Sequence, residues 1–97
     1  MATYIMLLRF TEQGIKNIKE SPARVEAAKQ AARDMGAEVK EFYAVIGQYD
    51  TVLVVEAPDD ETVARMALVL GSLGNVRTET LRAFTEDEYR KIISGLP

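Results

Sequence analysis

Few side chains in this sequence could do chemistry together, and most of them lie in or near the stretch VIGQYDTVLVVEAPDDE, Val45–Glu61. Tyr49 and Asp50 follow a glycine between two apolar runs, and Glu56 interrupts the second run. Loop residues often line the mouth of a pocket, and a carboxylate in a covered space can act as a general acid or base. The candidate pocket residues are therefore Tyr43, Tyr49, Asp50, Glu56, Arg9, Arg77 and Thr78.

Each of these residues also has a purely structural interpretation. Gly47 can supply a positive φ to a turn, Asp50 can cap its own backbone, and Tyr49 can pack its ring against a neighbour. Glu56 can form a structural ion pair with an arginine, and threonine is simply a good strand residue. The sequence favours these structural roles, and it identifies no catalytic residue.

The sequence contains no cysteine and no histidine. Thiolate catalysis, cysteine-based metal sites, the usual haem ligand and the commonest general base are therefore missing. The run Asp59-Asp60-Glu61 could bind Mg²⁺ or Ca²⁺, but three carboxylates at this position more often stabilise the positive end of a helix. We expect no metal and no prosthetic group.

Length and composition indicate one globular domain over residues 1–97, with 47% apolar residues and a net charge of −3. No basic block is available to neutralise a phosphate backbone, so we expect no nucleic-acid partner. The apolar start MATYIMLLRF is too short for a signal peptide, and no apolar run reaches membrane-spanning length. A cytoplasmic protein is expected.

Hydrophobic periodicity predicts four strands and three helices. The expected strands are Thr3–Phe10, Val39–Ile46, Thr51–Ala57 and Val76–Ala83. The first of them is apolar on both faces, so it should be central in its sheet. The expected helices run from Ser21 to Met35, over Glu61–Leu73, and from the capping sequence Thr85-x-x-Glu88 to Gly95. This order predicts an α+β, ferredoxin-like βαββαβ antiparallel sheet with both helices on one face, followed by a short C-terminal helix that docks through Tyr89, Ile92 and Ile93.

The face of the sheet without helices, called the open face below, is expected to be apolar. If GQYD (residues 47–50) is a four-residue hairpin loop, Ile46 pairs with Thr51 and Glu41 lies opposite Glu56. Phe42, Ala44, Ile46, Leu53 and Val55 then face the helices, and Val39, Tyr43, Val45, Val52 and Val54 lie on the open face. Monomers rarely expose such a patch, so we expect a homodimer or higher oligomer in which two sheets pack face to face.

The stretches GQYDTVLVVEAPDDE, LGNVRTETLRAF and YIMLLRFTEQGIKNIKESPAR resemble the GYD-domain family of small prokaryotic proteins. The likeness extends over nearly the whole chain, although Gln48 separates Gly47 from Tyr49-Asp50 in the Gly-Tyr-Asp motif. The resemblance implies a ferredoxin-like domain of the dimeric α/β-barrel type. It implies no specific activity.

Two functions are consistent with these observations. One is a homo-oligomeric module without a prosthetic group that binds a small metabolite or only associates with itself. The other is a cofactor-independent enzyme, oxygenase- or isomerase-like, that acts on a small aromatic or anionic metabolite through Tyr43, Tyr49, Glu56 and an arginine. The enzyme would need an enclosed cavity in which those groups converge.

Overall fold

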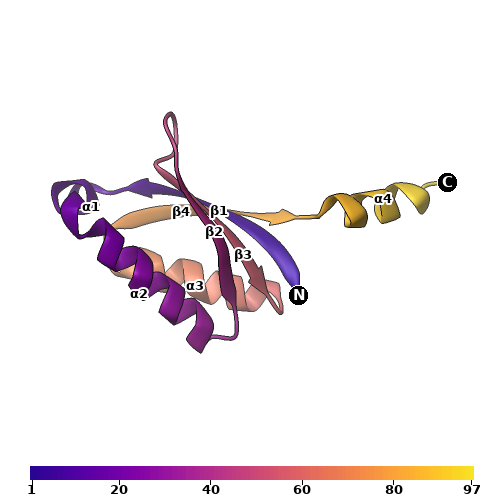
Figure 1. Ribbon diagram of the computed structural model, residues 1–97, viewed down its shortest axis with the longest axis horizontal. Helices are drawn as coiled ribbons and strands as arrows, with labels where there is room; N and C mark the ends of the chain where they lie inside the picture. Colours follow the sequence, from indigo (N-terminus) through magenta and orange to yellow (C-terminus); the bar gives the residue numbers. More distant parts are fainter.

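The computed structural model describes the whole chain, Met1–Pro97. Its elements are β1 (Ala2–Phe10), α1 (Glu12–Lys16), the 3-10 helix η1 (Ile18–Glu20), α2 (Ser21–Asp34), β2 (Glu38–Ala44), β3 (Thr51–Ala57), α3 (Asp60–Ser72), β4 (Val76–Ala83) and α4 (Glu86–Ser94). Helices α2 and α3 lie on the same side of one four-stranded sheet, and the other side carries no helix (Figure 1). The ferredoxin-like α+β fold predicted from the sequence is confirmed.

Strand β1 lies inside the sheet because its two neighbours hydrogen-bond to both of its edges. The strand order is β2-β3-β1-β4, and every pair is antiparallel. Alternate residues Tyr4, Met6 and Leu8 point to the helices and are only 3%, 0% and 6% exposed. They form the core with residues of β3 and α3. The apolar run on both sides of β1 was therefore a correct sign of an internal strand.

The hairpin between β2 and β3 differs from the prediction. Strand β2 ends at Ala44, which pairs with Thr51, and residues 45–50 form a six-residue loop closed by a 2.9 Å hydrogen bond from Val45 N to Asp50 O. Ile46 is consequently fully exposed in the loop instead of facing the helices. The prediction of a four-residue loop is wrong because Asp50 is hydrogen-bonded to β1: Asp50 N donates to Leu8 O at 2.9 Å.

The longer loop shifts the strand register by two residues. Tyr43 pairs with Val52, Glu41 lies opposite Val54, and the predicted pairing of Glu41 with Glu56 is wrong. A bulge between Val39 and Glu41 adds one residue to β2, and Glu38 is the residue that lies opposite Glu56. Because the bulge reverses the alternation of side chains along β2, Val39 packs against the core. The prediction that Val39 lies on the open face is wrong.

Local signals fix the ends of the long helices. The side chain of Asp59 caps α3 by accepting hydrogen bonds from Thr62 N at 2.9 Å and Thr62 Oγ1 at 2.7 Å. Gly36, with φ +84°, follows α2 in the left-handed conformation that glycine adopts easily. Helix α3 packs against the core through Val63 and Met66, which are both 3% exposed.

Helix α1 packs closely on the turn between α3 and β4. Thr11 N donates to Asn75 O at 3.0 Å, and Thr11 Oγ1 accepts a 3.1 Å hydrogen bond from Gly14 N at the start of the helix. A Cβ atom on Gly14 would lie 2.0 Å from the carbonyl oxygen of Asn75. Only glycine fits at this position, because the backbone of α1 is in contact with the backbone of Asn75.

Helix α4 does not dock on its own chain, and the predicted contact through Tyr89, Ile92 and Ile93 is wrong. These residues are 58%, 46% and 46% exposed. Strand β4 leads directly into α4, which lies beyond the end of the sheet (Figure 1). The radius of gyration, 14.6 Å, accordingly exceeds the roughly 12.5 Å expected of a compact domain of this length. None of the helices combines the length and apolar character needed to cross a membrane.

Candidate functional site

The loop between β2 and β3 places Tyr49 beside Arg9. The Arg9 guanidinium lies 4.7 Å from the centre of the Tyr49 ring, and Arg9 Nε donates a 2.9 Å hydrogen bond to Gln48 O. The Tyr49 hydroxyl donates to Glu79 Oε2 on β4 at 3.1 Å. Tyr49 thus spans from the hairpin loop to the opposite edge strand, and Glu79 is a partner that the sequence did not indicate.

Asp50 fastens the same loop to β1. Its Oδ2 accepts a 2.9 Å hydrogen bond from Phe10 N, in addition to the backbone bond from Asp50 N to Leu8 O. Gly47 has φ +126°, a conformation that a side chain would strain. The motif residues Gly47, Tyr49 and Asp50 therefore all have structural roles in this chain: they shape the loop and attach it to the sheet.

Arg77 completes a group at this end of the open face. It lies directly opposite Arg9 in the pairing of β1 with β4. Arg9, Tyr49, Asp50 and Arg77 are thus brought together, and the two arginines place positive charge side by side where like charges repel. The carboxylates of Asp50 and Glu79 lie near these arginines, so this end of the open face carries charges of both signs.

The remaining candidate residues lie elsewhere. Tyr43 is on the open face but on the outer strand β2, with Val52 and Leu7 between it and Glu79 in the same row. Glu56 pairs with Thr3, six residues along β1 from Arg9, which is a separation of about 20 Å. Thr78 pairs with Leu8 and belongs to the helix-covered side. The seven residues do not converge on one cavity.

The three carboxylates Asp59, Asp60 and Glu61 each have a partner. Asp59 caps α3, and the hydrogen bond from the Thr62 hydroxyl lowers the pKa of its carboxyl below the ordinary 3.8. Asp60 accepts a hydrogen bond from the buried Tyr4 hydroxyl, which raises the pKa of that phenol above 10.0. Glu61 pairs with Arg65 at 3.2 Å. No group of three or more potential metal-ligating side chains is clustered in the structure.

A cavity of about 240 Å³ lies between the sheet and the helices α2 and α3. Its walls are mostly apolar and include Val25, Ala28, Phe42, Leu53, Val69 and Leu73. Sequence reasoning did not find this cavity. The only available signal was the series of small residues on α2, because Ala27, Ala28 and Ala31 all line the space and fill little of it.

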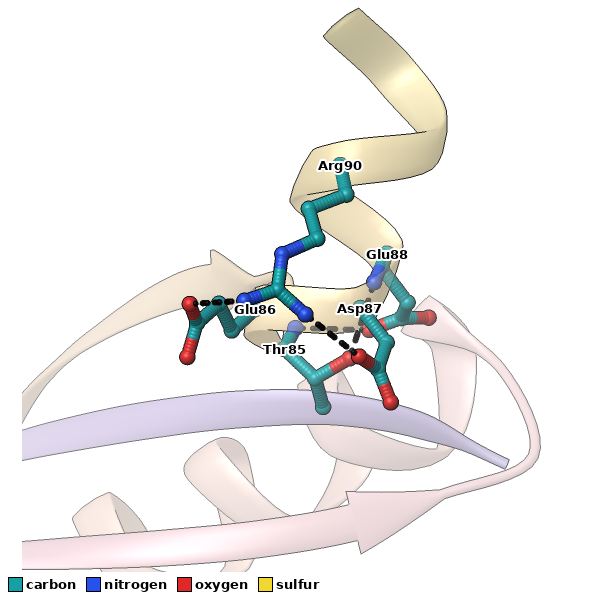
Figure 2. Close-up of polar contacts among 5 residues, drawn as sticks. All are labelled: Thr85, Glu86, Asp87, Glu88 and Arg90. Atoms are coloured by element: carbon teal, nitrogen blue, oxygen red, sulfur yellow. Dashed lines mark hydrogen bonds and ion pairs between the residues drawn. The ribbon is translucent and has the colours of Figure 1, made fainter. Parts of the chain in front are cut away.

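Helix α4 is stabilised within itself (Figure 2). Thr85 Oγ1 accepts a hydrogen bond from Glu88 N at 3.2 Å, and Glu88 Oε1 accepts one from Thr85 N at 2.8 Å, so the predicted capping box is confirmed. The bond from Thr85 N lowers the pKa of the Glu88 carboxyl. Arg90 pairs with Glu86 at 2.8 Å and with Asp87 at 3.4 Å. The helix therefore presents its apolar residues Tyr89, Ile92 and Ile93 without support from the rest of the domain.

The chain is similar to proteins of known sequence and structure over most of its length. It is 45% identical over 84 residues to the glutamine synthetase and cystathionine beta-lyase binding protein of Thermus thermophilus, a match that spans 86% of this chain and 88% of the relative. A Thermus thermophilus protein of known crystal structure has 33% identity and a TM-score of 0.57, over 88% of this chain and 95% of that one. A hypothetical protein from Pyrococcus horikoshii shares the fold, with a TM-score of 0.56 and 22% identity over 89% of this chain and 93% of its own.

The family model of the GYD domain matches residues 4–93 of this chain, which confirms the resemblance expected from the sequence. The match runs from β1 through nearly all of α4, so it includes the hairpin loop and the projecting helix. This chain belongs to the GYD domain family.

Proposed function

We propose that this chain is a non-catalytic module that pairs with a second copy of itself, binds other proteins and also binds a small metabolite. The observation that carries the proposal is the open face of the sheet, which is apolar and carries no helix (Figure 1). The name of the Thermus relative, which describes binding to two enzymes, supports a protein-binding role for this chain as well.

The apolar residues of the open face form a continuous patch across all four strands. One row contains Tyr43, Val52 and Leu7, and the next contains Val54, Ile5 and Leu81. Tyr43 is 54% exposed and Leu81 is 45% exposed. Uncovered patches of this kind mark interaction surfaces, and a second copy with the same patch covers it most simply through two-fold symmetry.

The charges at the two ends of the open face support this pairing. Arg9 and Arg77 lie at one end, with Glu79 in the neighbouring row, whereas Glu56 lies at the other end and Glu41 in the row next to Glu56. If two sheets pack with their β1 strands antiparallel, the arginines of each copy approach the glutamates of its partner. Opposite charges across an interface fix its orientation, so the charge pattern selects this arrangement over the parallel one.

We assign protein-partner binding to α4. An amphipathic helix commonly binds by laying its apolar side in a groove of its partner. Helix α4 has this character, because Tyr89, Ile92 and Ile93 are exposed while Glu86, Asp87 and Arg90 form ion pairs on its surface. Helix α4 lies beyond the end of the sheet and is not part of the open face (Figure 1).

Binding to purified glutamine synthetase and cystathionine beta-lyase from the same organism tests the proposal. We expect at least one of them to bind with a Kd of about 1 μM or tighter, measured by biolayer interferometry. The variant Ile92→Glu/Ile93→Glu should abolish this binding and retain the oligomeric mass of the parent. Absence of binding to both enzymes, or loss of self-association in the α4 variant, would refute the assignment.

The alternative of a cofactor-independent enzyme has less geometric support. Its proposed groups Tyr43, Tyr49 and Glu56 belong to the open face or its rim, whereas the cavity of about 240 Å³ is on the helix-covered side. The separation of about 20 Å between Glu56 and Arg9 also prevents them from acting on one small substrate. The same cavity does provide a place for a metabolite, so metabolite binding remains part of the proposed function.

A further inference from the structure

We infer that the cavity between α2, α3 and the sheet is a binding site for a small apolar monocarboxylate. The inference rests on the metabolite-binding part of the proposed function and is independent of the protein-binding part. The site is defined here by its apolar walls and by three polar side chains, Arg24, Lys29 and Thr51, all of which line the cavity.

The apolar walls determine the body of the ligand. Side chains of both helices and of all four strands line the space, and thirteen of its eighteen lining residues are hydrophobic. An apolar protein cavity of about 150 Å³ accommodates benzene, so a cavity of about 240 Å³ has room for an aromatic ring or a branched chain with a short extension.

The charged side chains determine the head group. Arg24 and Lys29 both come from α2, and no aspartate or glutamate is among the lining residues. Arg24 is held in place by hydrogen bonds from Nη1 to Asn17 O at 3.0 Å and from Nη2 to Gly14 O at 3.2 Å. These bonds occupy two of its five N–H donors and leave three. The lining residues of the cavity therefore include two cationic side chains and no carboxylate.

Lys29 keeps donors available for such a carboxylate. Its Nζ is 3.9 Å from Glu26 Oε1, and its side chain is 32% exposed. A single partner at this distance is a weak ion pair, and an ammonium has three donors. Lys29 is therefore able to bind an anion without breaking an essential contact of the fold.

Thr51 supplies a third polar group to the cavity wall. The residue is only 7% exposed and lines the cavity. Its hydroxyl can both donate and accept a hydrogen bond, so it can bind a ligand oxygen, whereas a pure hydrocarbon would gain nothing from it.

Titration of the full chain with 3-phenylpropanoate, and with its neutral amide as the matched control, tests the inference. Methyl NMR resonances of Val25, Leu53 and Val69 report on the cavity walls, and those of Val52 and Val54 on the open face report binding elsewhere. We expect shifts confined to the cavity residues and about tenfold tighter binding of the acid than of the amide, which is the effect of one charged hydrogen bond.

Three variants separate the contributions of the charge, the hydroxyl and the free space to ligand binding. Lys29→Gln should bring the affinity for the acid close to that for the amide, Thr51→Val should weaken both ligands, and Ala28→Leu should reduce binding by filling the space. Equal affinity for acid and amide in the parent, shifts at the open face, or a change of oligomeric mass on ligand addition would each overturn the inference. The mass and the enzyme binding of Lys29→Gln should equal those of the parent, so a failure of the protein-binding proposal would be recognised separately.

Discussion

The two faces of the sheet carry similar residue types but have very different surroundings. On the helix-covered face, Met6, Leu53 and Val55 are between 0% and 4% exposed. On the open face, Ile5, Leu7 and Val54 are only partly buried, although they alternate with those core residues along the same strands. The covered face explains how the chain folds, and the uncovered face indicates what it binds.

A similar contrast separates the two helices that flank β4. Helix α3 buries Val63 and Met66 in the core, whereas α4 leaves Ile92 and Ile93 exposed. Both helices begin with an efficient cap, at Asp59 and Thr85 respectively. Local stability therefore does not distinguish them. The difference lies in the packing surface: α3 packs on its own chain, whereas the apolar residues of α4 have no such contact, and we assign them to a protein partner.

The largest expected effect comes from the covered face. Met6→Ala removes a fully buried side chain and should lower the free energy of unfolding by about 2–5 kcal/mol, measured by urea denaturation. The neighbouring variant Ile5→Ala should cost less at low protein concentration and should weaken the dependence of stability on concentration. Equal, concentration-independent losses for both variants would remove the distinction between the faces.

Close backbone contact on the covered side gives the next largest effect. Gly14→Ala would place a Cβ atom 2.0 Å from Asn75 O and should cost about 1–3 kcal/mol of stability as the two segments separate. Gly71→Ala is the matched control, since its Cβ would meet no atom within 4 Å. The control should stabilise α3 by about 0.5–1 kcal/mol, so thermal midpoints that move in the same direction would contradict this account.

The fold could be predicted from the sequence because its signals are local and mutually consistent. Two-sided apolar character placed β1 inside the sheet, and helical spacing of apolar residues identified α3. The hairpin was predicted incorrectly because its loop is set by contacts distant in sequence, namely those of Asp50 with Leu8 and Phe10. The bulge in β2 left no recognisable sign in the residue pattern.

The candidate site was predicted only in part for the same physical reason. Arg9, Tyr49, Asp50 and Arg77 meet because β1, β4 and the loop are neighbours, which the topology implied. The cavity depends on the distance between α2 and α3, and no short sequence pattern specifies such a distance. The exposure of α4 depends on the direction in which the chain leaves β4, which its capping box does not determine.

Charge reversal on the open face tests whether the two copies pack with their β1 strands antiparallel. Arg77→Glu should weaken self-association about tenfold, because the end of the face that carries Arg9 and Arg77 loses its positive charge. Combining it with Glu56→Arg should restore much of the affinity, measured by sedimentation equilibrium. Additive losses in the double variant would exclude the antiparallel arrangement, since the two sites would then not face each other.

Acid sensitivity gives the smallest expected effect and concerns the covered side. Because the pKa of Asp59 is lowered in the folded state, its contribution to stability is present above the unfolded pKa near 3.8 and is lost as the pH falls through the folded value. Asp59→Asn should therefore reduce the loss of stability below pH ~4, measured by denaturation across pH. An unchanged acid dependence in this variant would contradict the role given to the Asp59 cap.

Self-association through the open face is the central claim, and sedimentation of the purified chain at micromolar concentration tests it most directly. The parent should sediment with at least twice the 10.8 kDa mass of one chain. Leu81→Glu, on the open face, should reduce that mass, and Ile15→Glu, at a similarly exposed position on α1, should leave it unchanged. A parent protein that sediments as a single 10.8 kDa chain would contradict the account.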